Sequence, residues 1–410
     1  RLSQTFILNE ILALGQSGLD LWVFPITNPQ EGIVQERVRQ VRAPVQYLEA
    51  FRRQPRSSRA AQREHVFSLS PVRYLQTLLY VTRNKHLDAG YRNSTRFECF
   101  EMAIYLAWKI EEARQKTGKR MSRLHAHFAH DPALIALLTH MLLGIPFSFT
   151  AHARDLYQLA VSALEERARH AFAVVTCCGA NRDYMGQVLP EALSTKVHLI
   201  HHGVDVQSFY PAPDTLPVPD APLILSVGRL IEKKGFPALL DAFKMLKDSG
   251  QHFKGEIYGD GLLYDHLAMT IQQNELQAHV ILGGAKQQDE LVPLFQKAAV
   301  FALTPSVTND GDRDGIPNVL VEAMACGIPI ISTAVAGIPE LVTHGLNGLL
   351  YEPEDVKGIA SGLSDLLKDE NRRKRMGQAA RQTVLDRFDL KVSGHRMANL
   401  LLQMEAVGGG

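Results

Sequence analysis

The sequence predicts an α/β chain of two Rossmann-like domains, each built on a parallel sheet. Short apolar runs of strand type alternate with amphipathic stretches of helical period, which is typical of βαβ units. The alternation stops at a proline-rich segment and then starts again, and the length of 410 residues suits two or three domains. Open parallel sheets bind ligands at the carboxyl ends of their strands, so we expect the two domains to face a central cleft.

The first half of the chain alternates less regularly than the second. We expect strands at residues 19–26, 123–128, 146–151, 173–176 and 197–201, and long helices at 71–83 and 97–115. An apolar run between Asp131 and His152 approaches the length of a membrane span. Gly144 and Pro146 interrupt it, so we interpret it as a buried helix, a turn and a buried strand.

A change of composition separates the two halves. Residues 208–222 contain five prolines, which restrict the backbone and remove ladder donors, so this segment is expected to be a linker. It divides an N-terminal domain (1–207) from a C-terminal domain (223–386), followed by a helix and tail (387–410). Expected strands of the second half are 223–227, 255–258, 280–282, 300–303, 328–332 and 348–350, and expected helices are 236–248, 262–273, 318–325, 356–368, 370–386 and 391–406.

The overall composition excludes several classes of protein. Lys and Arg number 44 against 43 Asp and Glu, which argues against a nucleic-acid binder. Four cysteines without a C-x-x-C spacing argue against a disulfide scaffold and a structural zinc site. Reduced thiols are typical of the cytoplasm, where we expect the protein to act. We expect no cofactor and no metal.

The most informative stretch runs from Asp314 to Gly327. Gly315 lets the loop approach a ligand closely, and Pro317 is placed where a helix should start. The start of that helix offers free N–H groups and a positive dipole, which together form an anion site. Asp314 precedes the helix and Glu322 lies about two turns into it, so the two carboxylates could hold opposite ends of one bound molecule.

A second motif in the same half adds positive charge. An expected strand ends at Gly228, and Arg229 and Lys234 follow before the next helix. An arginine fork and a lysine point charge are both suited to a diphosphate. Together with an anion-binding helix in the same domain, they favour a nucleoside diphosphate as the ligand.

These motifs closely resemble those of the retaining glycosyltransferases of family 4, which have the two-domain GT-B fold. The resembling residues of the second half are Gly203-Val204-Asp205 with Phe209, Gly228-Arg229 with Lys234-Gly235, Tyr258-Gly259-Asp260-Gly261, Asp314 with Glu322-Ala323-Met324-Ala325, Gly337-Ile338-Pro339-Glu340, and Asn347-Gly348. The first half is similar to a branch that makes exopolysaccharides, through Ser3-x-Thr5-Phe6-Ile7-x-Asn9-Glu10, His125-x-His127 and Thr150-x-His152.

The resemblance implies a site for the donor diphosphate. Arg229 and Lys234 would hold the diphosphate beside the Gly228 turn, and Asn318 and Val319 would offer it backbone N–H groups.

It also implies contacts to the sugars of the donor. Glu322 would bind the ribose hydroxyls, and Asp314 would bind hydroxyls of the donor sugar. Gly259 and Gly315 would line the donor site, and His152 would face the reacting sugar from the N-terminal domain. Asp314 stands where the family usually has a glutamate, which is one methylene longer.

The function implied is transfer of a hexose, with retention of configuration, from a nucleotide diphosphate sugar to an acceptor hydroxyl in polysaccharide or glycolipid synthesis. UDP-sugars and GDP-mannose both fit the motifs, and the acceptor is expected to be a saccharide or a lipid-linked molecule. Two alternatives stay open: a nucleotide-sugar epimerase of the same architecture, and an inactive protein that binds sugar nucleotides. Family members begin with a central strand and a glycine-bearing turn, which Arg1 follows, so we expect a truncated form of a longer protein.

Three further patterns have competing interpretations. Asp310-x-Asp312-x-Asp314-Gly315 resembles the start of a calcium loop, but Val321 occupies the position of the closing glutamate. His125 and His127 share one face of a strand, which suits a metal pair less well than a structural or acceptor-side role. Five arginines could be a solvated surface or could contact an anionic membrane at its inner face; they are Arg52, Arg53, Arg56, Arg59 and Arg63.

Overall fold

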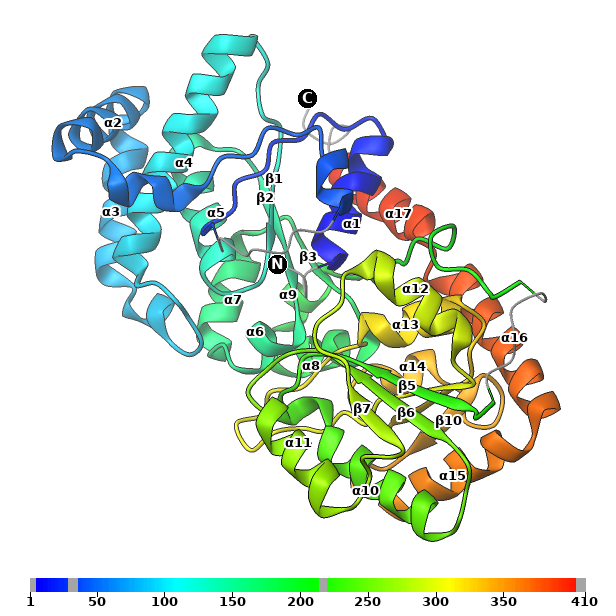
Figure 1. Cartoon of the computed structure of the whole chain (residues 1–410). Helices are drawn as coiled ribbons and strands as arrows, with labels where there is room; N and C mark the ends of the chain where they lie inside the picture. The colour runs from blue at the N-terminus through cyan, green and yellow to red at the C-terminus, as the bar shows by residue number, and fades with distance from the viewer. Residues whose placement is uncertain (1–4, 29–35, 214–219, 403–410) are drawn as a thin grey trace. The chain divides into compact units, whose positions relative to one another are not determined.

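The structure is a computed structural model that describes residues 5–28, 36–213 and 220–402 (Figure 1). The chain forms two compact units, each built on a parallel sheet. Unit N consists mainly of residues 41–200. Unit C consists mainly of residues 201–397 and also includes the first helix, α1 (Thr5–Gln16).

The sheet of unit N has four parallel strands in the order β1-β2-β3-β4. They are β1 (Leu124–His127), β2 (Phe147–Ala151), β3 (Ala173–Thr176) and β4 (Val197–Leu199). Every residue of β2 and β3 is buried, as expected for parallel strands that are covered on both faces. The four expected strands between residues 123 and 201 are therefore confirmed.

Helices surround this sheet and form most of the preceding segment. Their bounds are η2 (Leu48–Arg53), α2 (Arg56–Leu69), α3 (Pro71–Arg83), η3 (Lys85–Asp88), α4 (Arg96–Thr117), α5 (Asp131–Leu143), α6 (Ala153–Tyr157), α7 (Val161–His170), α8 (Gly179–Val188) and α9 (Glu191–Ser194). Helix α5 is apolar and mostly buried, and it ends at Gly144 in the left-handed conformation before β2 begins. The apolar run is thus a buried helix, a turn and a buried strand. None of the described helices is both long enough and apolar enough to cross a bilayer.

The strand expected at residues 19–26 is wrong. This segment makes a single parallel bridge, between Val23 and Val45, and no regular strand. Pro25 lacks an N–H group, so it can only accept a bond, which it does from Leu48 at 2.8 Å. Backbone hydrogen bonds join the segment to residues 44–49, but they form only one ladder bridge, so the pairing is too short for a regular strand.

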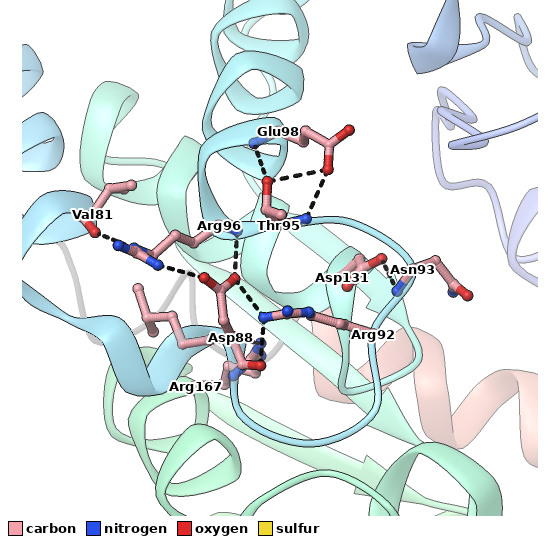
Figure 2. A network of polar contacts seen from close by, with 10 residues as sticks. Val81, Asp88, Arg92, Asn93, Thr95, Arg96, Glu98, Asp131 and Arg167 are labelled. Atoms are coloured by element: carbon pink, nitrogen blue, oxygen red, sulfur yellow. Dashed lines mark hydrogen bonds and ion pairs between the residues drawn. The ribbon is translucent and has the colours of Figure 1, made fainter.

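A polar network fixes the loop that leads into α4 (Figure 2). Arg96 donates from its side chain to Asp88 at 2.5 Å and to the carbonyl of Val81 at 2.8 Å. Thr95 and Glu98 form a capping box at the start of α4. Because these contacts satisfy both ends of the loop, α4 begins at a defined residue beside the sheet.

The sheet of unit C has six parallel strands in the order β10-β9-β8-β5-β6-β7. They are β5 (Leu223–Val227), β6 (Lys254–Tyr258), β7 (Val280–Leu282), β8 (Val300–Ala302), β9 (Ile330–Thr333) and β10 (Gly348–Tyr351). The chain builds outward from β5 in one direction and from β8 in the other, so strand order reverses between these two strands. Such a switch point leaves a crevice at the carboxyl ends of the two strands, where ligands of this class of fold bind.

The remaining elements of unit C include all six helices expected in the second half, together with four short elements that the sequence analysis did not anticipate, at 36–40, 232–234, 288–297 and 338–341. Their bounds are η1 (Glu36–Gln40), η4 (Glu232–Lys234), α10 (Phe236–Asp248), α11 (Tyr264–Gln273), α12 (Gln288–Lys297), α13 (Asn318–Ala325), α14 (Ile338–Leu341), α15 (Val356–Lys368), α16 (Glu370–Arg387) and α17 (Leu390–Leu402). The last residues expected in the final helix, 403–406, lie outside the described residues. The domain boundaries expected at 207, 222 and 386 stay predictions, because the two compact units are discontinuous in sequence.

Candidate functional site

The switch point of unit C carries both of the motifs that the sequence singled out. The turn at 228–235 follows β5, and the loop that ends at Pro317 follows β8. Gly235 has a φ of 68°, and a Cβ there would lie 1.6 Å from the carbonyl oxygen of Thr304. The Thr304 hydroxyl donates to the carbonyl of Gly235 at 2.7 Å. The turn at 228–235 and the start of the loop after β8 are therefore held against each other by a contact that only glycine permits.

A second glycine contact brings in the turn after β6. Gly259 has a φ of 156°, and a Cβ there would lie 1.8 Å from the carbonyl oxygen of Gly228. The backbone N–H of Gly228 donates to Tyr258 at 3.0 Å. The Gly228 and Gly259 turns thus pack backbone to backbone.

Two lysines and two aspartates connect the motifs through charge. Lys234 contacts Asp314 at 2.5 Å, and Lys233 contacts Asp314 at 3.3 Å and Asp312 at 2.9 Å. Both lysines are buried. Burial alone would raise the pKa of Asp314, but the two ammonium groups outweigh it and hold this pKa at about 2. Asp314 is consequently ionised at neutral pH.

The same contacts bear on the calcium interpretation of this loop. Asp312 and Asp314, the second and third carboxylates of the pattern, face lysine ammonium groups. Asp310 accepts from the Thr308 hydroxyl at 2.5 Å and from the N–H of Asp312 at 3.2 Å. The positive charge that these carboxylates need is thus supplied by side chains of the chain itself, and Lys233 is a member of the cluster that sequence reasoning missed.

Helix α13 begins directly after this cluster. Pro317 caps it from outside instead of occupying its first turn, and Asn318 is its first residue. The first N–H groups of a helix, here those of Asn318 and Val319, have no partner within the helix. Gly315 is buried, and its carbonyl accepts from Gly337 at 3.1 Å, which fixes the approach of the loop. The first residue of the helix therefore lies four positions beyond an aspartate that is paired with Lys234.

Helix α1 is a neighbour of this N-terminus that the sequence did not indicate. The Asn318 side chain donates to the Thr5 hydroxyl at 3.4 Å. Phe6 of the same helix stacks on His202, with ring centroids 4.5 Å apart. The motif at residues 3–10 resembled the exopolysaccharide branch, but nothing in its spacing predicted contact with the C-terminal motif.

Glu322 lies inside α13 and is only 4% exposed. Its carboxylate accepts from the Gln288 side chain, at the start of α12, over 3.0 Å. Burial raises the pKa of Glu322 to about 7, although the bond from Gln288 opposes the rise. A buried carboxylate with a single amide donor is poorly compensated, which is typical of a group retained to bind a ligand. Gln288 is the second residue that the sequence analysis missed.

Arg229 differs from the other cations of the site. It is exposed, and its guanidinium makes no hydrogen bond or ion pair with any described residue. It follows Gly228 in the same turn as Lys233 and Lys234, so the turn presents two buried cations and one exposed cation.

His152 belongs to unit N and follows the buried strand β2. Its backbone N–H donates to Asp155 at 3.2 Å, and Asp155 also accepts from the N–H of Ala129 at 2.5 Å. Burial raises the pKa of Asp155 to about 7 despite these backbone donors. The His152 ring stacks against His127 with centroids 5.7 Å apart. The carboxyl ends of β1 and β2 are thus joined through one buried carboxyl group.

His125 shows a structural pattern of contacts. Its two ring nitrogens lie 2.8 Å from the Ser148 hydroxyl and 2.9 Å from the Thr150 hydroxyl, both on the neighbouring strand. The ring of His127 lies 5.2 Å away on the same strand face, as the spacing predicted. These cross-strand bonds occupy both nitrogens through which His125 could bind a metal.

The structure therefore gathers most of the predicted residues in unit C around one switch point. Direct contacts join Lys234 to Asp314 and Gly228 to Gly259, and the chain continues from Asp314 into α13. His152 belongs to unit N, where it follows β2 at the carboxyl edge of that sheet.

The family models and relatives that this chain matches are glycosyltransferases. The family description "Glycosyl transferases group 1" matches residues 213–383, and "Glycosyltransferase Family 4" matches residues 87–208. A putative colanic acid biosynthesis glycosyltransferase of Escherichia coli is 38% identical over 209 residues, which is 50% of this chain and 51% of that protein. An uncharacterised glycosyltransferase of Methanocaldococcus jannaschii is 30% identical over 266 residues, which is 63% of this chain and 69% of that protein.

The matched part spans about half the length of the first of these relatives. A solved structure of Anabaena HepE with UDP and glucose superposes with a TM-score of 0.71 at 17% identity, covering 98% of this chain and 96% of that one. This likeness concerns the fold. Together with the family matches and the relative from Methanocaldococcus, it shows that the chain belongs to the family 4 glycosyltransferases of GT-B fold.

Proposed function

We propose that the protein transfers a hexose from a nucleoside diphosphate sugar to an acceptor hydroxyl during the synthesis of an exopolysaccharide or glycolipid. The observation that carries this proposal is the cluster of Lys233, Lys234 and Asp314 at the switch point, immediately before the start of α13. The relative from Escherichia coli is named for colanic acid biosynthesis, which favours a polysaccharide product. Because the four cysteines are all buried free thiols, we assign the reaction to the cytoplasm.

The diphosphate is proposed to bind between the Gly228 turn and α13. Its negative charge grows as the glycosidic bond stretches, so groups that hold it lower the barrier. The Lys234 ammonium and the N–H groups of Asn318 and Val319 are the groups of this chain suited to the task. Arg229, exposed in the same turn, would add a planar fork to the outer phosphate oxygens.

The two carboxylates are proposed to hold the sugars on either side of the diphosphate. Asp314 would accept hydrogen bonds from hydroxyl groups of the hexose. It can do so while ionised because Lys233 stays paired with it. Glu322, buried inside α13, would accept hydrogen bonds from the ribose hydroxyls. Lys234 would then leave Asp314 for the phosphate without stranding a buried negative charge.

We propose same-face displacement, with retention of configuration at the transferred carbon. Neither Asp314 nor Glu322 is assigned as a nucleophile, because each has a binding role. The departing phosphate takes the proton of the acceptor hydroxyl, and the oxygen of that hydroxyl forms the new bond to the sugar. His152 is proposed to donate a hydrogen bond to the hexose, with its backbone held by Asp155.

Turnover of UDP-glucose and GDP-mannose by Lys234→Ala tests this proposal. The matched control is Lys254→Ala, an exposed lysine at the amino end of β6 in the same unit. We expect Lys234→Ala to lower turnover by roughly 100-fold, since loss of one preorganised donor costs about 3 kcal/mol. The anomeric configuration of the product, read by proton NMR, should match that of the donor. Unchanged turnover in Lys234→Ala would refute the diphosphate assignment, and an inverted product would refute the stereochemical one.

A further inference from the structure

Helix α3 of unit N presents a large apolar face to solvent. Val72, Leu75 and Leu79 are 65%, 55% and 46% exposed. Their spacing of three and four residues places them on one side of the helix. Leu69, the last residue of α2, is also exposed and lies three residues before Val72 in the sequence. We call these four residues the α3 stripe.

The helix pair that carries the stripe is strongly basic. Residues 52–85 contain eight arginines and lysines and one acidic residue, Glu64, whereas the whole chain has a net charge of only +1. From Ser70 to His86 there is no aspartate or glutamate at all, and Arg73, Arg83 and Lys85 are exposed.

Two of the arginines on which the sequence had focused have local partners. Arg52 pairs with Glu98 at 3.1 Å, and Arg63 pairs with Glu101 at 2.6 Å. Helices α2 and α3 pack on each other and on α4 and α5, so the pair is held firmly in the unit (Figure 1). The α3 stripe and the cations beside it are therefore a better candidate for a binding surface than the five arginines.

Arg83 lies four residues after Leu79 and so on the side of α3 that carries the stripe, whereas the Arg73 side chain lies beside Gly144 at the end of α5. Apolar and basic groups together on one exposed helix surface match the chemistry of an anionic lipid bilayer. Leucines and valine would enter the boundary between head groups and acyl chains, while arginines and lysines would pair with lipid phosphates. A second copy of the chain fits less well, because two strongly basic helix pairs would repel each other across the contact. An acidic protein would satisfy the charge but would not explain why the exposed side chains on this face of α3 are so largely aliphatic.

We propose that α3 docks this protein on an anionic membrane, with the α3 stripe inserted and the cations around it on the lipid head groups. This surface lies wholly in unit N and uses none of the residues assigned to the donor. Docking of this kind would bring the enzyme to acceptors that are anchored in the bilayer.

Co-sedimentation with lipid vesicles tests the proposal on the full chain. Vesicles of equal parts phosphatidylcholine and phosphatidylglycerol should bind the protein, and vesicles of phosphatidylcholine alone should bind it much more weakly. The triple variant Val72→Ser, Leu75→Ser, Leu79→Ser should lose roughly 100-fold in affinity for the anionic vesicles. Arg83→Gln with Lys85→Gln should lose about 25-fold, since each cation near the surface contributes about fivefold.

A matched control separates docking from general loss of apolar surface. Met269, Ile281 and Leu346 in unit C are 53%, 50% and 60% exposed, so their triple serine variant removes a similar amount of exposed apolar side chain. It should bind anionic vesicles as the unchanged protein does, and circular dichroism should show both variants folded. Equal binding to both kinds of vesicle, no binding to either, or equal losses in the two triple variants would overturn the proposal. So would a dimer that dissociates only in the α3 variant, because a second copy would then cover the stripe.

Discussion

Replacing Glu322 by glutamine should make the protein more stable at neutral pH while weakening its binding of the donor. Glu322 is buried in α13 with one side-chain donor, Gln288. The glutamine keeps the shape and an oxygen that can accept from Gln288, but it carries no charge. A carboxylate retained for structure would give the opposite result, because its loss would destabilise the fold.

The size of the effect follows from the pKa of the carboxyl group. Burial raises this pKa from its ordinary 4.5 to about 7. As pH rises, the unfolded chain therefore releases the Glu322 proton before the folded protein does. The free energy of unfolding of the unchanged protein falls from about pH 4.5 to about pH 7 by about 3 kcal/mol through this group, and above pH 7 its contribution is constant. The free energy of unfolding of Glu322→Gln should not fall in this way, because glutamine does not titrate.

Urea unfolding at pH 4.5 and pH 8 measures the difference. We expect the variant to gain about 3 kcal/mol over the unchanged protein at pH 8 and almost nothing at pH 4.5. Circular dichroism is the appropriate signal, because both tryptophans, Trp22 and Trp108, lie in unit N while Glu322 lies in unit C. Glu354→Gln, an exposed carboxylate of unit C, controls for the change in net charge. Equal stability gains of Glu322→Gln at the two pH values would refute the burial argument.

Three further substitutions probe the rest of the site. Lys233→Met removes a buried partner of Asp314 and should lower the free energy of unfolding by about 3 kcal/mol; urea unfolding checks this, and a change below 1 kcal/mol would mean that Lys234 alone balances the loop. Gly259→Ala should place a Cβ against the Gly228 carbonyl oxygen, 1.8 Å away if nothing moved. The melting temperature should therefore drop and donor binding should weaken. A variant with an unchanged melting temperature would contradict the close packing. His152→Ala should reduce kcat by about 100-fold with little change in the donor KM, and an effect on KM alone would remove the residue from the reacting sugar.

Regular elements could be predicted from the sequence because their signals are local. The helices at 71–83, 236–248, 318–325 and 356–368 have the bounds expected from their periodicity, and every strand of unit C was anticipated within about two residues. The strand expected at 19–26 was wrong because a strand needs a continuous ladder, and the hydrophobic pattern does not show how far the pairing with residues 44–49 extends. Whether residues 19–26 form a strand depends on their pairing with residues distant in the sequence.

The candidate site shows the same division between local and long-range information. Lys234, Asp314 and the start of α13 were recognisable as motifs, and Gly228 was recognisable as the turn that ends an expected strand. The partners of those residues were not recognisable. Gln288 reaches Glu322 from 34 positions away, and Thr5 reaches Asn318 from 313 positions away. Such contacts arise from the topology of the sheet and leave no periodic trace in the sequence.

The central claim is that the switch point of unit C binds a diphosphate, and calorimetric titration with UDP, GDP and the two monophosphates tests it most directly. We predict that at least one diphosphate binds, that its monophosphate binds at least about 10-fold more weakly, and that Lys234→Ala but not Lys254→Ala abolishes the difference. Equal affinity for monophosphate and diphosphate, or a Lys234→Ala variant that still distinguishes them, would contradict the account.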